Sequence, residues 1–88
     1  MTPKPTLPLV LSPGACIGIV GGGQLGRMLA LAAAELGFQT HIFCPEENSP
    51  ASQVATFSTQ ANYDDKSALD RFANSVDVVT YEFENIPV

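Results

Sequence analysis

The feature that most constrains the fold is a glycine-rich turn between an apolar run and a helical pattern. The apolar run covers residues 16–20, the turn reads Gly-Gly-Gly-Gln-Leu-Gly, and residues 27–36 continue with helical spacing. Strand, glycine turn and helix in this order form the first half of a βαβ unit. Free N–H groups at such a helix start favour an anionic or strongly polar ligand. The G-x-G-x-x-G spacing of this glycine loop is filled by Gly21, Gly23 and Gly26.

Strand and helix patterns alternate along the rest of the chain. Apolar and β-branched runs predict further strands at 39–44, 54–58 and 76–83. Helices are predicted at 24–36 and 66–73, the second capped by Asp64 or Asp65. The positions of the first helix expected to cover the sheet are Leu25, Met28, Leu29, Ala32 and Leu36.

Strands separated by helices imply a parallel sheet with right-handed crossovers. We therefore predict an α/β fold with a Rossmann-like parallel sheet and the strand order 3-2-1-4. In that order the carboxyl ends of strands 1 and 4 flank a crevice in which ligands of such folds bind. Residues 1–15, with four prolines among them, are expected to form a poorly ordered extension, and residues 16–88 the Rossmann-like domain.

Composition excludes several classes of function. Four basic residues against nine acidic ones give a net charge of -5, and the basic residues form no cluster. We therefore expect no binding to nucleic acid or to an anionic membrane surface. No apolar run approaches the roughly 20 residues needed to span a bilayer. Cys16 and Cys44 have no metal-site spacing and are interpreted as buried free thiols in a reducing cytosol.

The glycine spacing alone leaves a dinucleotide site open as an alternative. A nicotinamide or flavin domain would place an acid at the end of the second strand, to accept the ribose hydroxyls. Cys44 and Pro45 stand there, and Glu46 and Glu47 fit a solvated loop better. The pattern therefore disfavours an NAD or FAD domain of an oxidoreductase, which we keep as the second hypothesis. A free-standing binding module is the third.

Two sequence-distant motifs together are far more specific than the glycine spacing. The run G-G-G-Q-L-G-R-M begins at Gly21, and Y-E-F-E-N-I-P begins at Tyr81. With them, the chain from Cys16 to Pro87 resembles the amino-terminal domain of the 5-(carboxyamino)imidazole ribonucleotide synthase family. This family, also called the ATPase subunit of phosphoribosylaminoimidazole carboxylase, belongs to the ATP-grasp superfamily. Cys44 departs from the family's pattern, which usually has an aspartate before the proline.

The resemblance implies a cytoplasmic, homodimeric ligase of purine biosynthesis. Its reaction joins bicarbonate to the amine of 5-aminoimidazole ribonucleotide and converts ATP to ADP and phosphate. ATP and Mg²⁺ would be held by grasp domains that follow this pre-ATP-grasp domain and are absent from the 88 residues. We therefore expect these residues alone to be inactive.

The resemblance also implies which residues contact the substrate. Gln24 and Leu25 match a pair at the helix start, and Glu82 matches the family's glutamate at the end of the fourth strand. Glu84 and Asn85 are second choices. No residue is predicted to be catalytic or to bind metal. His41 is interpreted as a sheet residue and Arg27 as a surface residue.

Overall fold

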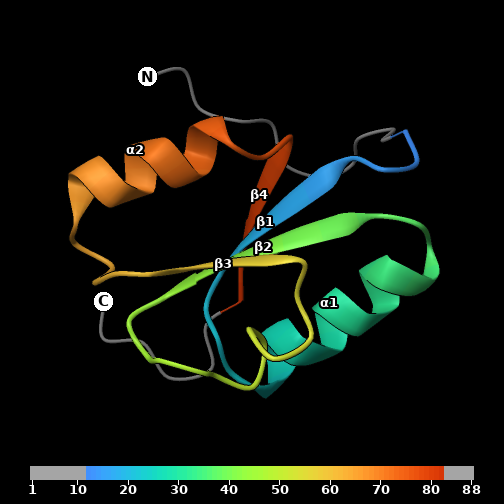
Figure 1. Ribbon diagram of the computed structural model, residues 1–88, viewed down its shortest axis with the longest axis horizontal. Helices are drawn as coiled ribbons and strands as arrows, with labels where there is room; N and C mark the ends of the chain where they lie inside the picture. The colour runs from blue at the N-terminus through green and yellow to red at the C-terminus, as the bar shows by residue number, and fades with distance from the viewer. Residues whose placement is uncertain (1–11, 83–88) are drawn as a thin grey trace.

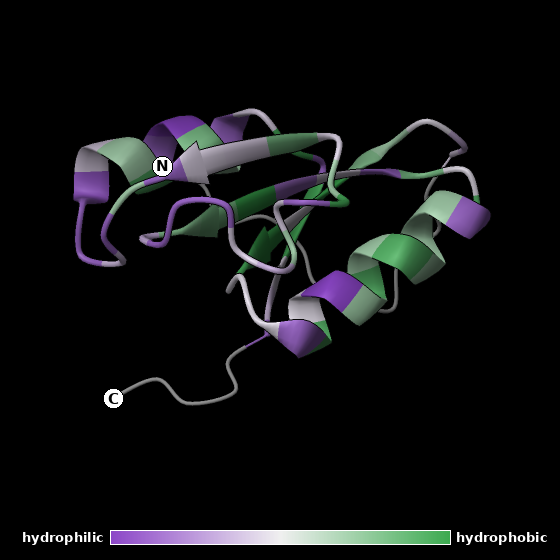
Figure 2. Cartoon of the chain, turned by 60° about the horizontal axis from the view of Figure 1, so that its bottom comes forward, coloured by the Kyte–Doolittle hydropathy of each residue, from purple (hydrophilic) through white to green (hydrophobic). Residues whose placement is uncertain are grey.

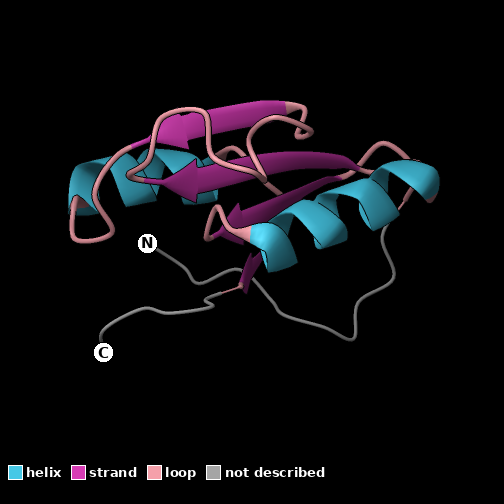
Figure 3. Ribbon diagram, turned by 90° about the horizontal axis from the view of Figure 1, so that it is seen from below, coloured by secondary structure: helices cyan, strands magenta, loops and turns pink. Residues whose placement is uncertain are grey.

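The computed structural model describes residues 12–82 as a four-stranded, all-parallel sheet with a helix on each face. The strands are β1 (Cys16–Val20), β2 (Gln39–Cys44), β3 (Phe57–Gln60) and β4 (Val78–Tyr81). The helices are α1 (Gln24–Glu35) and α2 (Lys66–Asn74). The sheet order is β3-β2-β1-β4, so the predicted fold class and strand order are confirmed. Figure 1 and Figure 3 show α1 and α2 on opposite sides of the sheet.

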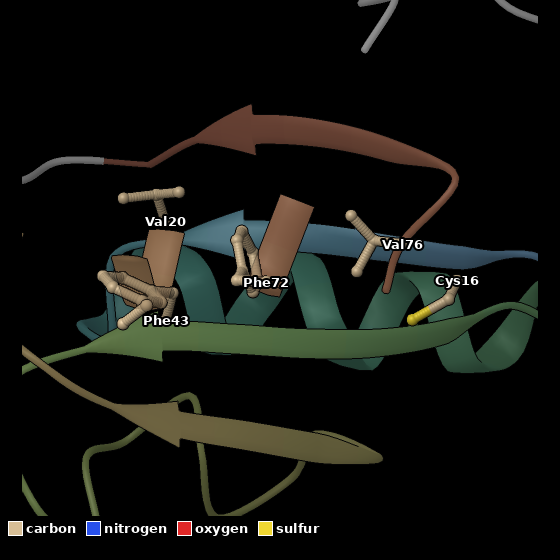
Figure 4. Packing of buried hydrophobic residues seen from close by; sticks show 6 residues of the cluster. Cys16, Val20, Phe43, Phe72 and Val76 are labelled. Carbon is tan, nitrogen blue, oxygen red and sulfur yellow. The ribbon is translucent and has the colours of Figure 1, made fainter. Parts of the chain in front are cut away.

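Side chains alternate across the sheet and build two separate cores. On the α2 face, a cluster is formed by Cys16, Val20, Phe43, Ala68, Phe72 and Val76 (Figure 4). On the α1 face, the cluster is Ile19, Ala30, Ile42, Cys44 and Ala51. Both cysteines are buried and free, as the sequence predicted. The β1 strand therefore contributes to both cores, which fits its continuous apolar run.

The predicted inner face of α1 is only partly right: Leu29 packs against the α1-face core, but the other predicted positions are exposed. Leu25, Met28 and Leu36 are 47%, 64% and 71% exposed, whereas the buried positions are Gly26, Ala30 and Ala33. The reason is close packing at the glycine turn. A methyl group at Gly26 would lie 2.9 Å from the Gly21 carbonyl oxygen, so this side of the helix must face the turn. The larger side chains are thereby rotated outward. Figure 2 shows the hydrophobic middle of α1 between hydrophilic residues near its two ends.

Two predicted strand boundaries are also wrong. The third strand was expected at 54–58, but Val54 closes a turn by donating its N–H to the Ala51 carbonyl at 3.2 Å, and the strand begins at Phe57. The fourth strand begins at Val78 rather than residue 76, because residues 76 and 77 form the bend that follows α2. Asp77 then links to β1, since its carboxylate accepts a hydrogen bond from the Cys16 N–H at 2.8 Å.

The expectation for residues 1–15 falls largely outside the described residues and stays a prediction. Within the described range of 12–82, no helix has the length and apolar character needed to cross a membrane.

The cap of α2 can be tested with neighbouring aspartates. The Asp65 carboxylate accepts a hydrogen bond from the Ala68 N–H at 3.0 Å, whereas Asp64 is exposed in the preceding turn. We expect Asp65→Ala to lower the free energy of unfolding by about 1 kcal/mol, and Asp64→Ala by less than about 0.5 kcal/mol. Urea denaturation measures both changes. Equal losses in the two variants would contradict the assignment of the cap.

His41 should make stability depend on pH. Its Nε2 lies 2.7 Å from Thr59 Oγ1 and its Nδ1 lies 3.1 Å from Ser75 Oγ. Ser75 donates its own proton to the Phe72 carbonyl at 2.7 Å, so its oxygen is left to accept from Nδ1–H. The Thr59 hydroxyl can donate to Nε2 or accept from it, so both forms of the ring keep their hydrogen bonds, and it is burial that lowers the pKa of His41.

Because the folded pKa lies below the unfolded one, the unfolded state takes up a proton first as the pH falls. We expect stability to be full at about pH 7.5 and reduced at about pH 5.5, on either side of the ordinary histidine pKa of about 6.5. The urea midpoint at both pH values measures the loss, and His41→Gln should reduce it. An identical pH dependence in the variant would show that other groups cause the effect.

Candidate functional site

The candidate site lies where the ends of β1 and β4 meet the glycine turn. Gly21 has a φ of 130°, a conformation that side chains disfavour, and a methyl group on it would collide with the Glu82 carbonyl oxygen. The Glu82 N–H donates to the Val20 carbonyl at 3.0 Å and continues the pairing of β4 with β1. Two stretches far apart in the sequence are therefore in direct backbone contact at this edge of the sheet.

The N-terminus of α1 presents polar groups beside this contact. Gly23 is the N-cap residue, so no cap side chain accepts from the first N–H groups, and the first turn has no acidic residue. The positive end of the helix dipole is therefore not offset by a carboxylate in that turn. Gln24 and Leu25, both exposed, begin the helix here. A polar or anionic ligand suits this position.

Glu82 supplies a carboxylate on the β4 side of the site. The residue is partly buried, and its Oε1 accepts a hydrogen bond from Thr80 Oγ1 at 3.3 Å. An ionised carboxylate accepts more than one hydrogen bond, so this group can also accept from an amine or a hydroxyl of a ligand. The second-choice residues Glu84 and Asn85 lie outside the described residues.

Gly22 has a packing role that the sequence analysis did not assign. A methyl group on Gly22 would lie 2.6 Å from Cys44 Sγ and 2.7 Å from Ser49 Oγ. Its carbonyl oxygen accepts a hydrogen bond from the Ala51 N–H at 2.9 Å. The sequence signal was the middle glycine of the consecutive run, because the G-x-G-x-x-G pattern allows any residue at this position. The turn is thus packed tightly against residues 44–51.

Arg27 was interpreted as a surface residue, but it makes tertiary contacts. Its Nη1 donates to the Pro50 carbonyl at 3.0 Å and to Gln53 Oε1 at 3.2 Å. One sequence feature could have indicated these contacts: Arg27 is a cation in the first turn of a helix, where a positive charge is unfavourable unless the side chain has another role. The residue Gln53 had no comparable sequence signal.

The end of β2 does not offer a ribose acceptor. Cys44 is buried there, and its thiol donates to Ser49 Oγ at 3.3 Å. Glu46 and Glu47 are exposed. The polar hollow beside them has a volume of about 130 Å³, well below the roughly 300 Å³ at which ordinary ligand pockets begin. Within residues 12–82, no group of three or more His, Cys, Asp or Glu residues could hold a metal ion.

A family model described as the ribonucleotide synthetase preATP-grasp domain matches residues 15–88. The N5-carboxyaminoimidazole ribonucleotide synthase of Brucella melitensis is 58% identical over 78 residues, which are 89% of this chain and 22% of that protein. The bifunctional purine synthesis protein purC/E of Dictyostelium discoideum is 68% identical over 80 residues, 91% of this chain and 8% of that protein. The chain thus spans about a fifth or less of these relatives' length.

Solved structures give the same result. The ADP complex of purK, an N5-carboxyaminoimidazole ribonucleotide synthetase, superimposes with a TM-score of 0.84 at 52% identity, covering 92% of this chain and 22% of that one. The Aspergillus clavatus N5-carboxyaminoimidazole synthase in complex with ADP and 5-aminoimidazole ribonucleotide has a TM-score of 0.73 at 34% identity. This match covers 85% of this chain and 20% of that one.

Substituting Gly21 should be more damaging than substituting another glycine with positive φ. Gly14 has a φ of 88° and open space around its Cα, so Gly14→Ala adds only backbone strain of about 1–2 kcal/mol. Gly21→Ala adds the collision with Glu82, and we expect a loss of about 3 kcal/mol in unfolding free energy. Urea denaturation compares the two variants. Equal losses of unfolding free energy in the two variants would show that a methyl group at Gly21 does not collide with Glu82.

Proposed function

Since this chain belongs to the family of ribonucleotide synthetase preATP-grasp domains, we propose that it is the substrate-binding domain of an ATP-dependent carbon–nitrogen ligase of purine biosynthesis. The full-length enzyme carboxylates 5-aminoimidazole ribonucleotide with bicarbonate and releases ADP and phosphate. A new bond joins the bicarbonate carbon to the amine nitrogen, and the oxygen lost from bicarbonate leaves with the phosphate. The 88 residues alone are inactive in this proposal.

The observation that carries the proposal is the backbone contact between the glycine turn and Glu82. It joins the helix start, with Gln24 and Leu25, to the carboxylate at the end of β4. These are the two stretches expected to bind one ligand from opposite sides of the crevice. The contact supports a single pocket that needs both motifs.

The roles of the residues follow from their chemistry. The Gln24 amide both donates and accepts, so it suits the polar groups of a ribonucleotide. The positive end of the α1 dipole suits its phosphate. Glu82 accepts hydrogen bonds from the amine or from the ribose hydroxyls and so orients the nucleophile. Leu25 contributes an apolar contact at the same helix start.

ATP and Mg²⁺ supply the activation of bicarbonate, and we place their site outside these 88 residues. In support, solved structures of longer relatives are complexes with ADP or ATP. No observation favours the oxidoreductase alternative, because the end of β2 holds a buried thiol in place of an acid. A cytoplasmic location and a homodimer remain part of the proposal.

Two substitutions test the substrate site in the full-length enzyme. We expect Glu82→Ala and Gln24→Ala each to raise the KM for the ribonucleotide about tenfold, because each removes a hydrogen bond to a polar or charged group. The KM for ATP should stay unchanged. Rates of phosphate release over a range of ribonucleotide concentrations, and then of ATP concentrations, give the two KM values. Rates without the ribonucleotide or bicarbonate show whether the reaction depends on them.

The matched control is Glu35→Ala, which removes an exposed acid from the far end of α1. It should leave both constants at wild-type values. Phosphate release that does not depend on the ribonucleotide would contradict the proposed reaction. Wild-type ribonucleotide KM values in both Glu82→Ala and Gln24→Ala would contradict the proposed site.

A further inference from the structure

We propose that Arg27 is a positioning residue, which holds the glycine turn and the start of α1 in place through a short loop segment. This segment, residues 48–53, is called the brace. The inference rests on the proposed function, because it concerns how the same substrate site keeps its shape. Arg27 is partly buried, and it reaches the brace from the first turn of α1.

Arg27 holds the brace at two points. Its Nη1 lies 3.0 Å from the Pro50 carbonyl oxygen and 3.2 Å from Gln53 Oε1. The other end of the Gln53 amide donates to the Asn48 carbonyl at 3.1 Å. A chain of hydrogen bonds therefore runs from the helix through Gln53 to the beginning of the brace. Hydrogen bonds from a charged donor are stronger than those from neutral donors.

The brace in turn holds the glycine turn. Ala51, which is fully buried, donates its N–H to the Gly22 carbonyl at 2.9 Å. Its Cβ would lie 3.3 Å from a methyl group at Gly26, so it fills the space that this glycine leaves. The residue before Ala51 is Pro50, the residue that Arg27 binds. Arg27 is therefore connected to the glycine turn, which leads into Gln24, by two successive hydrogen bonds: its own to the Pro50 carbonyl, and that of the Ala51 N–H to the Gly22 carbonyl.

The charge of Arg27 argues against a purely structural role. A cation in the first turn of a helix is unfavourable, because it lies at the positive end of the helix dipole. Both acceptors that hold Arg27 are neutral, so they do not cancel its charge. The charge adds to the positive end of α1, where the ribonucleotide phosphate is proposed to bind. Arg27 thus fixes the site's shape and strengthens its attraction for an anion.

The test uses four variants of the full-length enzyme. They are Arg27→Ala, Gln53→Ala, the double variant, and Arg71→Ala as the control. Arg71 is also an arginine on a helix surface, but it binds Ser67 Oγ at 2.8 Å on α2, on the other side of the sheet. The measurements are the KM for the ribonucleotide, the KM for ATP, kcat and the melting temperature.

We expect Arg27→Ala and Gln53→Ala to raise the ribonucleotide KM by about three- to tenfold, the effect of losing one or two hydrogen bonds. The double variant should raise it by less than the product of the single effects, because either single variant already removes the hydrogen bond between Arg27 and Gln53. The ATP KM and kcat should change less than twofold, and Arg71→Ala should match the wild type.

Three results would overturn the inference. A raised KM in Arg27→Ala with a wild-type KM in Gln53→Ala would show that Arg27 acts through its charge or by direct contact with the substrate, and not through the brace. Multiplicative effects in the double variant would show that the two residues act independently. A lower melting temperature with wild-type KM values would show a structural role only. If Arg27→Ala fails to fold, Gln53→Ala decides by itself, because the Gln53 side chain is exposed.

Failure of this inference can be distinguished from failure of the proposed function. If Gln24→Ala and Glu82→Ala raise the ribonucleotide KM while Gln53→Ala does not, only the role of the brace is overturned. If none of these variants changes that constant, the substrate site itself is overturned, and the inference about Arg27 with it.

Discussion

The structure depends on the close approach of backbones at the glycine turn. Because Gly21 has no side chain, the end of β4 comes into contact with the end of β1 at Glu82. Because Gly22 has none, Cys44 and Ser49 pack directly against the turn. A methyl group at either position would push apart elements that together form the candidate site. The same glycines that allow the local turn therefore also hold β1, β4 and the loop after β2 together.

This constraint also explains the unusual orientation of α1. An ordinary surface helix buries its largest apolar side chains, but α1 buries Gly26, Ala30 and Ala33 and exposes Leu25 and Met28. Small residues on the inner face let the helix lie close to the strands, with its N-terminus directed by the turn. The position of the helix start, where Gln24 lies, thus takes precedence over the burial of the leucines.

The end of β2 shows how one fold serves different chemistry. Dinucleotide-binding domains use this place for an acid that accepts ribose hydroxyls. Here the Cys44 thiol donates to Ser49 Oγ at 3.3 Å, and Ser49 Oγ accepts from the Ser52 N–H at 3.3 Å. The end of β2 therefore stabilises the loop that packs against the glycine turn. The groups suited to a ligand are at the other side of the turn, at the start of α1 and at Glu82.

The α/β fold, the parallel strand order and the place of the glycine turn could all be predicted from the amino-acid sequence. These follow from local patterns: an apolar run, glycine spacing and the alternation of strands with helices. The buried face of α1, the start of β3 and the binding of Arg27 to Pro50 and Gln53 became known only from the folded structure. Helix rotation depends on the close approach of Gly26 to the Gly21 carbonyl, and the Arg27 contacts join α1 to a loop distant in the sequence. Neither feature produces a periodic pattern in the sequence, because contacts between distant segments depend on packing and not on local conformational preference.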